Sequence, residues 1–82
     1  MDPHARQRMA ERNISEEDIA RTLSHPQNTL PAKKGRTEYQ SLLVRDNRIL
    51  LLILLLRVFV DFNVTPPLVV SVIATTQGKY WR

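Results

Sequence analysis

Cysteine is absent from the 82 residues of the chain, and histidine occurs only twice. Without cysteine the chain has no disulfide and no thiolate to bind a metal, which fits a reducing compartment. The two histidines and the scattered carboxylates also lack the spacing of a metal-ligand set. We therefore expect a protein without a metal site and without a cofactor.

Long apolar runs are missing as well. The run over residues 49–56 holds eight apolar residues, whereas a membrane-spanning helix needs about 20. The first residues are charged and contain no apolar stretch of the kind found in signal peptides. These features predict a cytoplasmic protein that does not enter a membrane.

Length and charge give a first indication of partners. A chain of 82 residues predicts one domain over residues 1–82, and a domain this small has a marginal core that a partner would stabilise. Residues 1–24 carry four arginines and five acids, a net charge of −1, whereas residues 25–82 carry eight basic and three acidic residues, a net charge of +5. The basic second half favours a polyanionic or acidic partner, although surface charge that serves only solubility gives the same balance.

Two helices are predicted in the N-terminal part. Asp2 can cap free N–H groups and Pro3 suits the first helical position. The second helix begins after Ser15, with Asp18 at the third helical position as a variant of the capping box. Pro26 ends this helix near residue 24 or 25.

Strand signals follow a basic loop over residues 26–35. We predict strands over residues 37–45, 48–60 and 68–75, with Asp46-Asn47 as a two-residue hairpin turn. Leucine is a weak strand former, so a helix over residues 49–56 is the rival interpretation; the flanking turn signals favour a strand. The predicted fold is α+β, with two N-terminal helices packed on a three- to four-stranded antiparallel sheet.

A two-residue turn fixes the pairing of the hairpin. Arg45 would lie opposite Arg48, and Arg36 would lie opposite Arg57. Two like charges in direct opposition are unfavourable unless an anion such as a phosphate lies between them. Odd-numbered residues of the first strand would face the helices. The opposite face would carry an apolar half, which predicts an interface with a second copy or another protein.

Both ends of the chain resemble a known bacterial family. The opening His4-Ala5-Arg6-Gln7-Arg8-Met9-Ala10-Glu11-Arg12-Asn13-Ile14, with Ile19, Leu23 and Pro26, is similar to the start of short bacterial proteins classed as domain of unknown function 4258. Residues 70–76 and the tail Lys79-Tyr80-Trp81 are similar to that family's last strand and end. The family in turn resembles the RelE/ParE toxin superfamily.

This resemblance implies the toxin of a type II toxin–antitoxin system. It implies ribonuclease activity on messenger RNA, often at the ribosome, and an antitoxin protein that neutralises the toxin. Metal-free RNA cleavage needs a base for the 2′-hydroxyl, cations for the transition-state charge and an acid for the leaving oxygen. The catalytic residues that we predict are Arg36, Arg57, Tyr80 and His4. The residues predicted to bind RNA are Lys33, Lys34, Arg45 and Lys79.

Other interpretations remain open. His4 at a helix start is more typical of a surface or capping histidine than of a catalytic one. A non-enzymatic module with the same fold would bury its apolar sheet face in a homodimer or against another protein, and would pair Arg36 and Arg57 with carboxylates such as Glu38 or Asp61. A third hypothesis is a ParE-like inhibitor of a DNA-processing enzyme.

Overall fold

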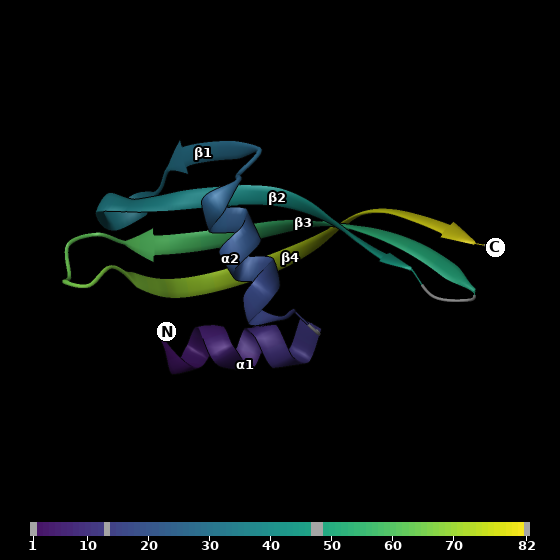
Figure 1. The fold of residues 1–82 in the computed structure, drawn as a ribbon, viewed down its shortest axis with the longest axis horizontal. Coiled ribbons are helices and arrows are strands. Elements are labelled where there is room, and N and C mark those ends of the chain that lie inside the picture. The colour runs from purple at the N-terminus through teal and green to yellow at the C-terminus, as the bar shows by residue number, and fades with distance from the viewer. Residues whose placement is uncertain (1, 13, 47–48, 82) are drawn as a thin grey trace.

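A four-stranded antiparallel sheet with two helices forms the molecule (Figure 1). The computed structural model describes residues 2–12, 14–46 and 49–81. The elements in chain order are α1 (Pro3–Arg12), α2 (Glu16–Ser24), β1 (Asn28–Pro31), the 3₁₀ turn η1 (Lys33–Gly35), β2 (Arg36–Asp46), β3 (Leu50–Asp61) and β4 (Leu68–Trp81). The predicted α+β class with an antiparallel sheet is confirmed, and the leucine-rich run is a strand. Among the described residues, no helix has the length and apolar character that crossing a membrane requires.

The ends of the helices are those that the sequence predicts. Asp2 Oδ1 accepts a hydrogen bond from the backbone N–H of His4 at 2.8 Å, which satisfies one free donor of α1. At α2, the Ser15 side chain accepts from the Asp18 N–H, and Asp18 accepts from the Ser15 N–H, so the capping box is complete. The helix then ends at Ser24, directly before His25 and Pro26.

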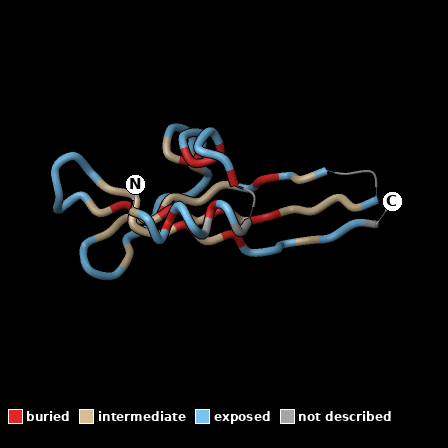
Figure 2. Tube along the Cα trace, turned by 90° about the horizontal axis from the view of Figure 1, so that it is seen from below, coloured by how far each residue is buried: buried red, intermediate tan, exposed pale blue. Residues whose placement is uncertain are grey.

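The two helices pack against different parts of the sheet. Helix α2 crosses one face and contacts β2 and β3, whereas α1 runs alongside β4 (Figures 1 and 2). The prediction that both helices pack together over one face is therefore wrong, because only α2 lies across the middle of the sheet. Helix α1 still contributes Ala5 and Met9 to the core.

The sheet is a simple meander in the order β1-β2-β3-β4. The β2–β3 pairing places Asp46 opposite Leu51 and Arg36 opposite Asp61. The predicted pairing of Arg36 with Arg57 is therefore wrong. Four residues, not two, separate the paired residues next to the turn, Asp46 and Leu51. Asn47 of the predicted turn and Arg48 of the predicted strand lie outside the described residues. The observed register avoids the repulsion between two arginines by placing a carboxylate opposite one of them.

The change of register leaves the two faces of the sheet as predicted. Side chains alternate between faces with a period of two, so a shift by four positions moves no residue to the other side. The residues of the sheet buried on the helix-bearing face are Leu43, Leu54, Leu56, Val58, Val60, Val72 and Ala74. Helix residues Ile14 and Ile19 complete this core. The opposite face carries no helix of the described chain, and we call it the open face.

Beyond the helices, the ends of three strands extend as an arm, which we define as residues 42–46, 50–53 and 77–80 (Figure 1). Strand β1 pairs with β2 only at residues 37–40. In the described chain, the outer edge of β2 thus has no strand beside it from residue 41 to residue 46. Leu42 and Val44 lie on this free edge with 45% and 57% of their surface exposed.

Candidate functional site

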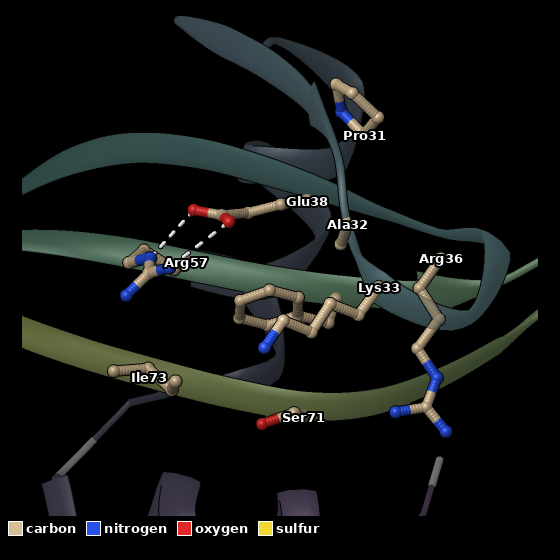
Figure 3. Close-up of a pocket in the computed structure, with 9 residues that line it drawn as sticks. Pro31, Ala32, Lys33, Arg36, Glu38, Arg57, Ser71 and Ile73 are labelled. Carbon is tan, nitrogen blue, oxygen red and sulfur yellow. Dashed lines mark hydrogen bonds and ion pairs between the residues drawn. The ribbon is translucent and has the colours of Figure 1, made fainter.

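An open cleft of about 660 Å³ lies on the open face, away from the arm (Figure 3). Its floor comes from β2, β3 and β4, and one side is walled by the segment that joins β1 to β2. The residues that line it are Pro31, Ala32, Lys33, Arg36, Glu38, Arg57, Phe59, Ser71 and Ile73. Three of these nine side chains are cations and one is a carboxylate, so the cleft is basic and suited to an anionic ligand.

An ion pair between Glu38 and Arg57 lies at one end of the cleft. Arg57 Nε donates to Glu38 Oε2 at 2.7 Å, and Arg57 Nη2 donates to Glu38 Oε1 at 3.2 Å. Gln40 Nε2 also donates to Glu38 Oε2. The hydrogen bonds from Arg57 hold the pKa of Glu38 below its usual value despite the opposing effect of burial, and Glu38 in turn raises the pKa of Arg57. Glu38 therefore stays ionised at neutral pH.

Arg36 occupies a different electrostatic position. It lies directly opposite Asp61, yet no salt bridge forms between them in the described chain. Its Nε is buried and donates to no acceptor among the described residues. A buried donor without a partner costs about 1–3 kcal/mol. Arg36 is thus a charged side chain of the cleft that forms no ion pair with a described carboxylate.

The turn that walls the cleft depends on an unusual backbone. Lys34 has φ 61° and Gly35 has φ +72°, so two consecutive residues occupy the left-handed region. This conformation reverses the chain so that Lys33 lines the cleft whereas Lys34 does not. In Figure 3, Lys33 extends from the wall and Arg36 from the start of β2, both toward β4, with Glu38 and Arg57 joined at the other end.

The other predicted site residues lie elsewhere. Arg45 is on the helix-bearing side, where its Nη2 pairs with Asp18 of α2, and that pairing is a structural contact. Tyr80 is opposite Leu51, six residues from Arg57 along β3 or roughly 20 Å away. Lys79, on the same arm, is opposite Leu52. His4 is exposed on α1. The structure therefore gathers Lys33, Arg36 and Arg57, and it does not bring Lys34, Arg45, Lys79, Tyr80 or His4 to them.

Six of the nine lining residues are not predicted as site residues from the sequence, and Glu38 and Phe59 are the two of these with a direct contact to Arg57. Glu38 was considered only as a partner for an arginine, and Phe59 was not singled out. Arg36, Glu38 and Gln40 alternate along one strand, which places three polar side chains on one face and is a signal that the sequence does contain. Phe59 follows Arg57 by two residues, so the same alternation places the two side chains on one face whatever the register. Its ring centroid lies 5.4 Å from Arg57 Cζ.

The cleft combines the ionised carboxylate of Glu38 with N–H groups of Arg57 at one end and of Lys33 and Arg36 at the other. Within the described residues, no group of three or more His, Cys, Asp or Glu side chains is arranged to hold a metal ion. A ligand with a negatively charged group and a transferable proton matches what these side chains offer.

Comparison with known proteins identifies the family. Residues 1–74 match the family described as Domain of unknown function (DUF4258). The chain belongs to that family. No curated protein and no solved structure matches the chain. The match to DUF4258 includes both helices and all the residues that line the cleft, and it ends before the arm portion of β4. The tail with Lys79 and Tyr80 thus lies outside the matched segment.

Proposed function

We propose that this DUF4258 protein is a metal-independent endoribonuclease that acts as the toxin of a type II toxin–antitoxin pair of the RelE/ParE kind. The observation that carries the proposal is the cleft, where Lys33 and Arg36 lie at one end and Arg57 with an ionised Glu38 at the other, on an uncovered sheet face. The substrate is messenger RNA, free or on the ribosome. An antitoxin protein is the proposed neutralising partner, and the cytoplasm is the proposed location.

Glu38 supplies the base in this proposal. Oε2 already accepts hydrogen bonds from Arg57 and Gln40, whereas Oε1 accepts one from Arg57 alone among the described residues. Each carboxylate oxygen accepts two hydrogen bonds, so Oε1 has one acceptor position left for the proton of an RNA 2′-hydroxyl. The 2′-oxygen then attacks the adjacent phosphorus, and the bond from phosphorus to the 5′-oxygen breaks. The products are a 2′,3′-cyclic phosphate and a 5′-hydroxyl end.

The cations stabilise the charge that develops on the phosphate. Arg36 forms no ion pair within the described residues, whereas Arg57 is paired with Glu38, which favours Arg36 over Arg57 as the main electrostatic contributor. Arg57 mainly orients Glu38. The leaving 5′-oxygen takes its proton from Lys33 or from water, since Tyr80 and His4 do not line the cleft.

The test is to map new RNA 5′ ends after brief induction of the protein in a bacterial host. Wild type should produce new 5′-hydroxyl ends inside coding regions, and Arg36→Met and Lys33→Ala should produce at least tenfold fewer. Lys34→Ala is the matched control, because Lys34 is adjacent and exposed but lies outside the cleft. No new ends from folded wild-type protein, or equal loss in the Lys34 variant, would contradict the proposal.

A second candidate function is a non-enzymatic module that binds a second copy or another protein. Two observations favour it: Arg57 is paired with a carboxylate, and the free edge of β2 exposes Leu42 and Val44. An unpaired apolar edge strand readily accepts another strand. Sedimentation of wild type should then show a dimer that Val44→Lys dissociates, whereas Val64→Lys, in the exposed loop before β4, should not. A monomeric wild type would exclude the homodimer.

A further inference from the structure

The floor of the cleft contains one aromatic side chain among polar neighbours. Phe59 is half-buried and lies opposite Glu38 on β2 and Ser71 on β4. The Arg57 guanidinium covers part of its ring at 5.4 Å from the centroid. The cations Lys33 and Arg36 belong to the same lining. An aromatic ring therefore lies within reach of positive groups in an open cavity.

Phe59 lies on the open face, whereas the apolar core is on the other face. A ring that served only packing would gain more from burial beneath α2 than from a floor open to water. The cavity volume of about 660 Å³ is within the range of small-ligand sites, about 300–1,000 Å³. Unpaired bases stack on aromatic side chains of exposed sheets, while basic groups beside them hold the phosphates.

We propose that the cleft binds one unpaired ribonucleotide, with its base stacked on Phe59 and its phosphate held by Lys33 and Arg36. This inference rests on the proposed function, since it specifies the substrate class as single-stranded RNA. Phe59 lies on the floor of the cleft, and the segment at Lys33 walls the cleft on one side. A base inside a duplex has both faces covered by its neighbours and cannot also lie on this ring. Phe59 is then the residue that distinguishes unpaired from paired RNA.

The test measures binding without cleavage. The ligand is a fluorescently labelled 2′-O-methyl RNA of about 12 nucleotides, used as a single strand or annealed to its complement, with fluorescence anisotropy as the readout. The missing 2′-hydroxyl prevents the proposed reaction. Wild type should bind the single strand at least tenfold more tightly than the duplex. Phe59→Leu should weaken single-strand binding about tenfold, since stacking on one aromatic ring contributes roughly 1–3 kcal/mol, or about 5- to 150-fold.

Three variants separate stacking from other effects. Phe59→Tyr retains a ring and should bind like wild type. Phe62→Leu makes the same substitution at an exposed phenylalanine outside the cleft and should leave affinity unchanged. Arg36→Met should reduce the salt dependence of binding, by about 0.7 in the slope of log K against log salt concentration, because one phosphate contact is lost.

The outcomes distinguish this inference from the proposed function. Equal affinity for both RNA forms, or equal effects of Phe59→Leu and Phe62→Leu, would overturn the inference even if the protein cleaves RNA. Phe59-dependent binding of the single strand by a protein that does not cleave ordinary RNA would support the site and overturn the ribonuclease function. Absence of any binding would overturn the nucleotide site.

Discussion

The ion pair between Glu38 and Arg57 provides the most direct test of what holds the open face together. The perturbation is Arg57→Met, which keeps an unbranched apolar stem over the sheet but removes the guanidinium. The Glu38 side chain is only 8% exposed. After the substitution, Gln40 is the one described side chain that still donates to this buried charge.

The size of the effect follows from the exposure of the two partners. Removing one partner of a fully buried ion pair costs about 3–5 kcal/mol. The Arg57 side chain is 35% exposed, so water screens part of the pair, and we expect a loss of about 2 kcal/mol in the free energy of unfolding. Glu38→Gln should cost about 1 kcal/mol, since the arginine left behind can reach water. The double variant should lose about 2 kcal/mol rather than 3, because the two side chains act as a pair.

Urea unfolding at pH 7, followed by circular dichroism, measures all four proteins of this cycle. Arg21→Met is the control, since the Arg21 side chain is 64% exposed and its Nη1 is as far as 3.9 Å from Asp18 Oδ1. Its loss in the free energy of unfolding should be below about 0.5 kcal/mol. Losses that add fully in the double variant, or no loss in Arg57→Met, would refute the reasoning. In that case Arg57 would be as free as Arg36 to bind RNA, and the proposal that Arg57 mainly orients Glu38 would be wrong.

Three further predictions concern the fold. Gly35→Ala should lower the free energy of unfolding by about 1–2 kcal/mol, since Gly35 has φ +72° and an added Cβ would lie 3.0 Å from Asn63 Nδ2; an unchanged melting temperature would contradict this. Ser15→Ala should cost about 1 kcal/mol through loss of the capping box, detectable as a melting temperature lower by roughly 4–8 °C. The pKa values of Asp18 and Glu38 are held below their usual 3.8 and 4.5, for Asp18 because hydrogen bonds from Ser15 and Arg45 outweigh the opposing effect of burial. Their contribution to stability is therefore complete above these values and is lost as the pH falls through the lower folded-state pKa values. Acid titration of unfolding should show a decline below about pH 4.5 that Asp18→Asn and Glu38→Gln make shallower.

Local sequence signals predicted the helices and strands of this fold better than they predicted which residues of neighbouring strands pair. The capping pattern at Ser15 and the alternation of apolar residues depend on neighbours a few positions apart, so the second helix and the faces of the strands could be predicted. Strand β1 could not, because Pro31 and its surroundings are typical of a loop; an edge strand tolerates proline since its outer side forms no ladder. The strand predicted over residues 68–75 is too short, because β4 continues to Trp81 beyond an irregularity in its pairing with β3, and Gly78 lies opposite Ile53 in this continued ladder.

The candidate site shows the same limit at longer range. Arg36 and Arg57 were placed on the open face correctly because an even change of register preserves faces. The residues predicted to lie opposite them on the neighbouring strand were wrong. These cross-strand partners depend on the exact register, which is set by the number of residues between the two strands. In the observed pairing Arg57 lies opposite Gln40 instead of Arg36, and Glu38 binds it diagonally across the two strands. A site built across strands thus cannot be predicted in detail until the turn is known.

The two sides of the cleft differ in how firmly they are anchored. Strand β3, in its floor, is bonded to a strand on each side along its length, whereas β1 is only four residues long and each of them is exposed. Amide hydrogen exchange should therefore be slow at Phe59 and fast at Leu30, because β1 can detach without opening the core. The volume available to a ligand is then set by the least stable strand of the sheet. A larger ligand would be accommodated by outward movement of this strand, while the groups on β3 keep their positions.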